Sequence, residues 1–384
     1  MKFLICANYL PHVLNFRGKL LKAIAALGYE VHVLVPDLES HPEDYSTLLQ
    51  LGYVIHEVPM QRTGTNPVAD IKTLIAIYRL LNKIKPDYIL SYTIKPVIYG
   101  TLAAWLAKVP KRYALLPGLG YAFTQVEQTE QRTLFQKLVH SMYKQALSKA
   151  TKVFFQNPDD LNLFKKLNLL KPSTPAVVVN GSGVDVANFS VLPFPRDDLG
   201  EIKPSFLLIA RLLKDKGLIE YVEAAKIIKE QYPTAEFHLV GWIDENPAAI
   251  DQTQLDDWVA AGVVTYWGKL DDVRPAIAAS SIYVLPSYRE GTSRSVLEAM
   301  AMGRPIITTD APGCRETVVE GANGYLVPVK SVKELAAAME KLLTNPELIT
   351  VMGEASRRLT EDKFDVHKVN QIMIEEMELV AADR

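Results

Sequence analysis

The chain has 384 residues with a formal net charge of −2, and 48% of the residues are hydrophobic and 22% are charged. This length suffices for two domains of ordinary size, and the composition is that of a soluble globular protein, which excludes disordered and collagen-like chains. No apolar run approaches the roughly 18 residues that a membrane-spanning helix needs. The start shows no signal-peptide pattern, so we expect a cytoplasmic protein with two free, buried thiols, Cys6 and Cys314.

The first half of the chain alternates short apolar runs with amphipathic runs of helical period. Strands are predicted at residues 3–7, 31–35, 53–58, 87–92, 113–116, 153–156 and 176–180. Helices are predicted at residues 14–27, 69–84, 97–107, 127–150 and 158–167. Strands that alternate with helices form right-handed βαβ units in a parallel sheet, so residues 1–187 are predicted to form a doubly wound α/β domain.

A proline-rich stretch without regular period, residues 188–204, interrupts this alternation and is predicted to be a linker. Strands are then predicted at 205–210, 236–241, 263–267, 282–286, 305–309 and 325–327. Helices are predicted at 218–230, 255–260, 273–279, 293–302, 332–343, 346–359 and 366–380. Residues 205–365 are therefore predicted to form a second doubly wound domain, with a ligand cleft where the carboxyl ends of the two sets of strands face each other.

The turn between a strand and a helix at residues 287–298 has the clearest functional pattern, because open α/β sheets bind ligands at such turns. Gly291 allows a tight turn and a close approach of ligand to backbone. Glu290 and Glu298 place acceptors at either end. The turn also places hydroxyl groups and free N–H groups at a helix N-terminus, which suits an anion; these belong to Thr292, Ser293 and Ser295. The pattern fits a nucleotide sugar, and the alternative is an ordinary capped helix.

A second charged turn follows the first strand of the second domain. Arg211 comes directly after that strand, and Lys216 follows five residues later. Arginine offers a bidentate fork and lysine a point charge, so the two residues suit a diphosphate. Taken alone, this turn could equally be the charged start of a helix.

These patterns together resemble family 4 glycosyltransferases. The resemblance lies in two glutamates separated by seven residues, Glu290 and Glu298, with the intervening glycine and hydroxyls and the sequence that continues to Ile307. Members of this family are retaining, nucleotide-sugar-dependent enzymes with the GT-B fold, which consists of two Rossmann-like domains around a cleft. The resemblance also implies that the last helix, residues 366–384, completes the N-terminal domain.

The resemblance implies a role for each matching residue of the second domain. Arg211 and Lys216 would hold the departing diphosphate, Glu298 the ribose hydroxyls, and Glu290 the hydroxyls of the donor sugar. Together with Glu290, the two cations form the expected catalytic set. Further contacts with the nucleotide sugar are expected from the loop after Glu290 and from two more strand ends, at Gly241, Lys269, Leu270, Gly291, Thr292, Ser293 and Ser295.

No cofactor is expected, and the transfer is predicted to be independent of metal. The chain has no Asp-x-Asp pair and no His, Cys and carboxylate cluster at metal-ligand spacing. Fixed cations and a helix N-terminus would therefore stabilise the leaving group.

The first domain is expected to bind the acceptor through three strand-end loops. Their candidate residues for the acceptor or a phosphate are Asn15, Arg17, Gly18, Lys95, Gly118 and Gly120. Many relatives carry a histidine near the third loop that meets the donor sugar, whereas this chain has Pro117 and Gly118 there.

A narrower resemblance concerns the substrate. The run Asp244–Pro247 and the segment Asn180–Asp185 resemble enzymes that add N-acetylgalactosamine or a related sugar to undecaprenyl-diphosphate-linked intermediates. The expected donor is thus a UDP-sugar, and the product would extend a surface glycan or glycoprotein precursor. Two alternatives remain open, a nucleotide-sugar epimerase of the same fold and a non-catalytic sugar-binding protein.

Charge is distributed unevenly along the chain. Residues 1–180 have 21 Lys and Arg against 12 Asp and Glu, a charge of +9, whereas the remainder has 21 against 32, a charge of −11. The basic half is predicted to approach an anionic membrane surface, which would place the protein at the inner face of the cell membrane. The amphipathic basic helix at 127–150 is the candidate contact, and its apolar stripe could equally pack into the domain core.

Overall fold

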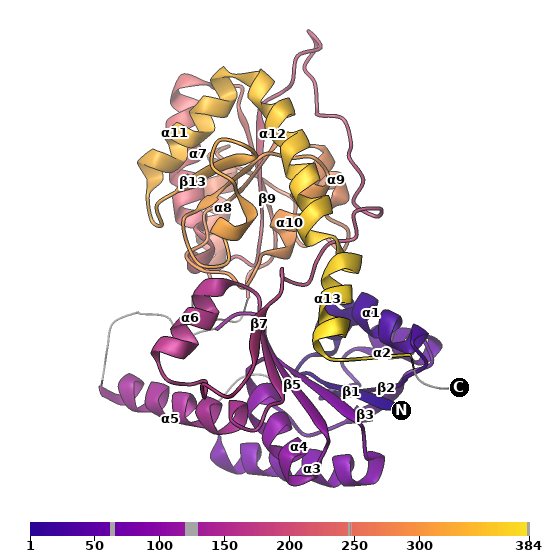
Figure 1. The fold of residues 1–384 in the computed structure, drawn as a ribbon. Coiled ribbons are helices and arrows are strands. Elements are labelled where there is room, and N and C mark those ends of the chain that lie inside the picture. Colours follow the sequence, from indigo (N-terminus) through magenta and orange to yellow (C-terminus); the bar gives the residue numbers. More distant parts are fainter. Residues whose placement is uncertain (62–65, 120–129, 245, 247, 382–384) are drawn as a thin grey trace. The chain divides into compact units, whose positions relative to one another are not determined.

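The computed structural model describes residues 1–61, 66–119, 130–244, 246 and 248–381, with the backbone alone for 130–135. The chain divides into two compact units. Met1–Ser182 and Val369–Arg384 form the N-terminal unit, and Gly183–Lys368 form the C-terminal unit. Both are α/β units, as the alternation of strands and helices predicts (Figure 1).

The described part of the N-terminal unit has a parallel sheet of seven strands in the order β3-β2-β1-β4-β5-β6-β7. Its strands are β1 (Lys2–Cys6), β2 (Glu30–Val35), β3 (Val54–Glu57), β4 (Tyr88–Tyr92), β5 (Lys111–Leu116), β6 (Lys152–Phe155) and β7 (Ala176–Val178). Its helices are α1 (Leu10–Ala26), α2 (Pro42–Gln50), α3 (Pro67–Ile84), α4 (Thr101–Leu106), α5 (Glu130–Leu147), α6 (Pro158–Lys166) and, at its end, α13 (Val366–Glu376).

Helices cover both faces of this sheet because successive strand residues point to opposite sides. Leu4 and Cys6 pack on the side of α3, α4, α5 and α6, which contribute Ile77, Ala103, Tyr143 and Phe164 among others. Phe3 and Ile5 pack on the side of α1 and α13. The C-terminal segment is tied to the sheet by the hydroxyl of Tyr113, which donates to the carbonyl of Met377 at 2.6 Å.

The C-terminal unit repeats this architecture with a parallel six-stranded sheet in its described part, in the order β10-β9-β8-β11-β12-β13. Its strands are β8 (Ser205–Ile209), β9 (Glu236–Val240), β10 (Thr265–Tyr266), β11 (Ile282–Leu285), β12 (Ile306–Thr309) and β13 (Gly324–Val327). Its helices are α7 (Leu218–Gln231), α8 (Gln252–Ala260), α9 (Arg274–Ala278), α10 (Arg294–Ala301), α11 (Val332–Thr344) and α12 (Pro346–Leu359).

Two elements differ from the sequence-based expectation in kind and not only in their bounds. Helix α2 was not predicted because Leu48 is its one buried residue, so it shows little apolar period. The helix expected at 97–107 is divided into a π-helical turn, Pro96–Gly100, and α4. Both differences concern local geometry and leave the order of the strands unchanged.

The segment predicted to be a linker, residues 188–204, belongs to the C-terminal unit, and the division between units falls after Ser182. The buried side chain of Arg304 attaches this segment to the unit. Its guanidinium donates hydrogen bonds to the carbonyls of Leu192 and Pro193 at 2.9 and 3.2 Å, and it stacks on the ring of Phe194. The proline-rich sequence therefore indicates irregular backbone but not a free connection.

Among the helices of the described residues, none is both long enough and apolar enough to cross a membrane. Helix α5 packs its apolar stripe into the core of the N-terminal unit through Val139, Tyr143 and Leu147. For these three residues of the basic helix the core alternative holds, whereas Leu138 is 58% exposed.

Candidate active site

The order of strands brings the two charged turns of the C-terminal unit together. Strand β8 lies between β9 and β11, so the loops that follow β8 and β11 start side by side. The strand order reverses between these two strands, which is where open α/β sheets bind ligands. Tyr288 in the second loop donates its N–H to the carbonyl of Asp215 in the first at 2.9 Å. Gly217 has a φ of +73°, and a Cβ there would lie 2.1 Å from the carbonyl oxygen of Pro286. The two loops therefore pack backbone to backbone.

This packing places Lys216 against Glu290. The Lys216 ammonium donates to Oε1 of Glu290 at 2.6 Å, and the two side chains are 16% and 14% exposed. An ammonium has three N–H donors, and this bond uses one of them. Glu290 therefore holds Lys216 in one orientation while the lysine retains donors that suit a phosphate.

Arg211 has an analogous partner that the sequence did not reveal. Its Nη1 lies 3.0 Å from Oδ2 of Asp244, which follows β9. Because β9 neighbours β8 in the sheet, the loops after these strands meet as those after β8 and β11 do. The carboxylate orients the guanidinium, whose five donors leave the fork available for a bidentate contact.

Glu298 lies on α10 and is buried. Burial raises the pKa of its carboxyl, and Arg294, which donates Nε to Oε1 at 2.8 Å, opposes that shift. The two residues are four apart on the helix, so sequence spacing could have indicated the pair. A buried carboxylate kept in place by one arginine is a strong acceptor for ligand hydroxyl groups.

The start of α10 is fixed by hydroxyl groups of the protein itself. Ser295 donates Oγ to the carbonyl of Ile209 at 3.0 Å and accepts from the hydroxyl of Tyr283 at 2.7 Å. Ser293, the N-cap residue, has its Oγ 3.2 Å from that of Ser295. The side chain of Ser295, predicted to bind the ligand, thus attaches the helix to the end of β8, and its backbone N–H remains the group that can meet an anion at this helix N-terminus.

The loop of Glu290, Gly291 and Thr292 rests on the segment that follows β12. Glu290 donates its N–H to the carbonyl of Pro312 at 2.9 Å. Gly313 has a φ of +78°, and a Cβ there would lie 2.0 Å from the carbonyl oxygen of Glu290. Thr292 donates its hydroxyl to the carbonyl of Gly291 at 2.9 Å. The sequence did not indicate this support.

Three residues predicted to contact the nucleotide sugar, Gly241, Lys269 and Leu270, follow β9 and β10, next to the loop of Arg211. Gly241 donates its N–H to the carbonyl of Gly268 at 2.9 Å, and its own carbonyl accepts from the hydroxyl of Tyr266 at 2.8 Å. A Cβ on Gly241 would lie 1.9 Å from the carbonyl oxygen of Ala210. The ammonium of Lys269 lies 5.5 Å from the ring centroid of Trp242, and the half-buried Leu270 packs on the core.

In the sheet of the N-terminal unit, the strand order reverses between β1 and β4. There the hydroxyl of Thr93 donates to Oδ1 of Asn8 at 2.8 Å, and Thr93 has a φ of +77°, which is unusual for a β-branched residue. Lys95, predicted for the acceptor side, lies in this loop and donates to Asp70 at 2.8 Å, which also accepts from Tyr99 at 2.9 Å. The loop is thus rigidly held at the edge where this sheet would bind a ligand.

The structure does not support the predicted phosphate contact of Arg17. Helix α1 starts at Leu10, four residues earlier than predicted, so Arg17 lies in mid-helix on the buried face. Its side chain is 1% exposed, and its guanidinium carbon lies 4.9 Å from the ring centroid of Tyr92. Burial lowers its pKa. Asn15 is exposed, while Gly18 and Gly118 are half-buried; Gly120 lies outside the described residues.

Comparisons with known proteins show the family of the chain. Residues 203–345 match the family model described as glycosyl transferases group 1, and residues 4–157 match the model described as glycosyl transferase 4-like. An N,N'-diacetylbacillosaminyl-diphospho-undecaprenol alpha-1,3-N-acetylgalactosaminyltransferase of Campylobacter jejuni is 30% identical over 346 residues, which cover 88% of each chain. The chain belongs to this family of glycosyltransferases.

A further relative is consistent with this family, and two solved structures share the fold. A UDP-Gal:alpha-D-GlcNAc-diphosphoundecaprenol alpha-1,3-galactosyltransferase of Escherichia coli is 26% identical over 81% of this chain and 80% of its own. Sucrose-phosphate synthase of Thermosynechococcus elongatus superposes with a TM-score of 0.78 at 19% identity and covers 98% of both chains. HepE of Anabaena, solved with UDP, gives 0.75 at 18% identity over 98% of this chain and 100% of its own. The predicted GT-B fold with two Rossmann-like units is confirmed.

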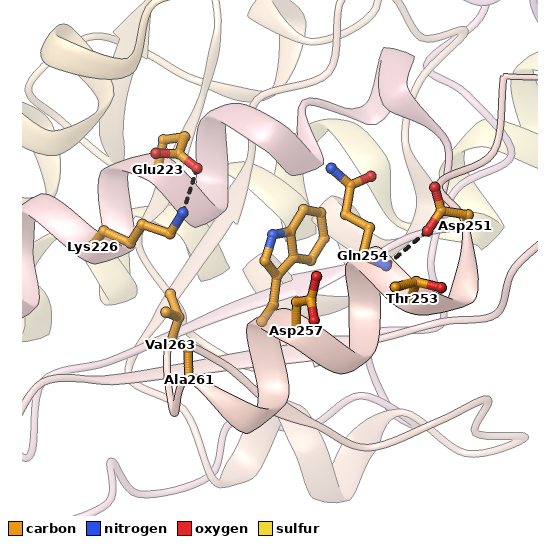
Figure 2. A pocket seen from close by; sticks show the side chains of 9 residues that line it. Glu223, Lys226, Asp251, Thr253, Gln254, Asp257, Ala261 and Val263 are labelled. Carbon is orange, nitrogen blue, oxygen red and sulfur yellow. Dashed lines mark hydrogen bonds and ion pairs between the residues drawn. The ribbon is translucent and has the colours of Figure 1, made fainter.

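Two other features of the glycosyltransferase bear on where its ligands bind. A hollow of about 690 Å³ lies between α7 and α8 (Figure 2), and none of the predicted site residues lines it. Three of its charged side chains stabilise the two helices: Lys226 pairs with Glu223 on α7, and Asp251 caps α8. Within the described ranges, no three His, Cys, Asp or Glu side chains are grouped as a metal site would require.

Proposed function

We propose that this glycosyltransferase moves a hexose or N-acetylhexosamine, with N-acetylgalactosamine as first choice, from a UDP-sugar to an undecaprenyl-diphosphate-linked sugar. The similarity to the Campylobacter jejuni enzyme, over 88% of both chains, carries the proposal, because that enzyme's name states this donor sugar and this kind of acceptor. The product would extend a surface glycan or glycoprotein precursor at the inner face of the cell membrane.

The proposed chemistry follows from the charges of the C-terminal unit. When the bond between the sugar and the diphosphate breaks, negative charge develops on the departing UDP. Lys216, Arg211 and the N-terminus of α10 would stabilise that charge, since fixed donors act strongly where water is excluded. Glu290 would orient donor-sugar hydroxyls and Lys216 together, and Glu298 would accept from the ribose. The configuration at the sugar would be retained.

A donor and acceptor screen tests this proposal. Purified protein is mixed with UDP-GalNAc, UDP-GlcNAc, UDP-Gal or UDP-Glc, with and without a polyprenyl-diphosphate-linked saccharide, and the products are identified by mass and NMR. We expect a new glycosidic bond of the α configuration only when donor and acceptor are both present. Conversion of one UDP-sugar to its epimer without acceptor would instead establish an epimerase, and binding without turnover would establish a sugar-binding protein.

Replacing Glu298 with glutamine is expected to weaken UDP binding without unfolding the protein. Loss of a charge-assisted hydrogen bond costs about 1.5–3 kcal/mol, or roughly 10- to 150-fold in affinity. Because burial raises the pKa of Glu298, ionisation of this carboxyl favours the unfolded state, and its contribution to stability falls as the pH rises through the raised pKa. The variant should therefore be at least as stable as the wild type at neutral pH.

Isothermal titration with UDP and thermal unfolding at several pH values measure these two effects. Glu354→Gln, an exposed change on α12, serves as the control and should alter neither quantity. Unchanged UDP affinity in Glu298→Gln would remove this residue from the proposed site.

Transfer is also expected to proceed without divalent metal. After treatment with EDTA and removal of the chelator, initial rates with and without added Mg²⁺ or Mn²⁺ should agree within about twofold, since Lys216 and Arg211 would supply the positive charge that a metal otherwise provides. A metal-dependent increase of tenfold or more, well above that range, would show that these cations do not suffice.

A further inference from the structure

Helix α3 of the N-terminal unit exposes an apolar stripe to solvent. Val68, Ile71, Ile75 and Tyr78 are 63%, 57%, 43% and 39% exposed. Their spacing of three, four and three residues places them on one face of the helix. The helix buries a different set against the sheet, which includes Thr73, Ile77, Leu81 and Ile84. Helix α3 is therefore apolar on two faces, and only one of them is covered.

A basic stripe runs beside this apolar one. Lys72, Arg79 and Lys83 are exposed, and at 100° per residue they fall next to the apolar stripe on the same outward side. The acidic residue of α3, Asp70, is turned inward and bound by Lys95 and Tyr99. The exposed side of α3 thus combines apolar and positively charged residues without an acidic one.

The neighbouring helix also exposes apolar side chains. Helix α4 packs against α3 (Figure 1), and Trp105 and Leu106 at its end are 43% and 48% exposed. The ammonium of Lys149 lies 4.2 Å from the ring centroid of Trp105. Tryptophan with a nearby lysine is typical of the interface between lipid and water.

We infer that this outer face of α3, with the end of α4, is the surface by which the protein binds an anionic lipid bilayer. The inference rests on the proposed lipid-linked acceptor, and it locates the membrane contact on α3, whereas the sequence indicated the basic helix α5. In the part of helix α5 whose side chains the structure describes, Val139, Tyr143 and Leu147 are buried in the core and are not available to a bilayer.

Charge complementarity favours a bilayer over a second copy of the chain as the occupant. Two α3 faces packed antiparallel around a twofold axis would bring the basic stripes of both copies together, and like charges repel. An anionic bilayer offers both partners that the face requires, acyl chains for the apolar stripe and phosphate groups for the lysines and the arginine.

Vesicle co-sedimentation of the full-length protein tests the inference. The wild type should bind vesicles of phosphatidylcholine and phosphatidylglycerol more tightly than phosphatidylcholine alone, and added salt should weaken that binding. The variant Ile71→Glu/Ile75→Glu should bind mixed vesicles roughly 10-fold less tightly or worse, and Lys72→Glu/Lys83→Glu should lose the preference for anionic lipid. The matched control, Leu49→Glu on α2 with Val351→Glu on α12, changes apolar residues of similar exposure and should bind as the wild type does.

The variants are also assayed for transfer to a water-soluble, short-chain acceptor, which should proceed at the wild-type rate. Wild-type binding by both α3 variants, or an equal loss in the control, would overturn the inference. So would light scattering that shows a wild-type dimer which Ile71→Glu/Ile75→Glu dissociates. If no sugar is transferred to any acceptor while α3 still directs vesicle binding, the proposed function fails and the membrane surface stands.

Discussion

Replacing Lys216 with methionine should lower kcat/KM by roughly 10²–10³-fold, which corresponds to the loss of about 2.7–4 kcal/mol of transition-state stabilisation. Methionine retains the length of the side chain and removes the ammonium that lies 2.6 Å from Glu290. The charge on the departing UDP would then lose a fixed partner, and Glu290 would lose the group that orients it. Arg211→Met is expected to act in the same direction.

The same turn supplies a matched control. Lys214 lies two residues before Lys216 in the same short 3-10 helix and is exposed. Initial rates over a range of UDP-sugar concentrations should show Lys214→Met close to the wild type, and all three variants should unfold at the wild-type temperature. Comparable losses in Lys214→Met and Lys216→Met would mean that the loop as a whole matters and not the ammonium of Lys216.

Replacing Arg304 with leucine should destabilise the C-terminal unit by about 3–5 kcal/mol, because a hydrogen bond to a charged group contributes about 1.5–3 kcal/mol and several are lost. The guanidinium donates to carbonyl groups of residues 192, 193, 277 and 302. Leucine would leave these carbonyls without the guanidinium, and residues 188–204 would lose one of their attachments, while Arg357 still donates to the carbonyl of Phe189 at 2.9 Å.

Urea unfolding followed by circular dichroism and by tryptophan fluorescence measures this loss. Arg358→Leu on α12 is the control, since its guanidinium is largely exposed and lies 3.7 Å from Glu354, and such a surface pair contributes about 0–1 kcal/mol. A loss below 1 kcal/mol in Arg304→Leu would show that residues 188–204 are held by other contacts.

The strands and most helices could be predicted from the sequence because apolar period and length are local properties. The helix 346–359 was predicted to the residue, and the strands of both sheets were found. The predicted start of α1 was wrong, because Leu10 and Val13 alone show too little helical period. This error placed Arg17 near the start of the helix, whereas it lies on the buried face in the middle of α1. Burial of a charged side chain depends on tertiary packing, which no local pattern contains.

Most partners of the candidate site residues could not be predicted, for the same reason. Residue type and resemblance indicated Lys216, Glu290 and Glu298, whereas their partners follow from strand order. Asp244 meets Arg211 only because β9 neighbours β8, and Ser295 is held by Tyr283 of β11. The pair of Arg294 and Glu298 was the exception, since a separation of four residues on a helix is readable from the sequence.

The three glycines at the site have a practical consequence for changing the sugar that the enzyme uses. At Gly217, Gly241 and Gly313 a methyl group would overlap a carbonyl oxygen of the adjacent loop. Any other residue there would displace the main chain that carries the proposed catalytic groups, so variant libraries should leave these positions untouched. Diversity is better introduced at neighbouring positions such as Trp242, which is 43% exposed.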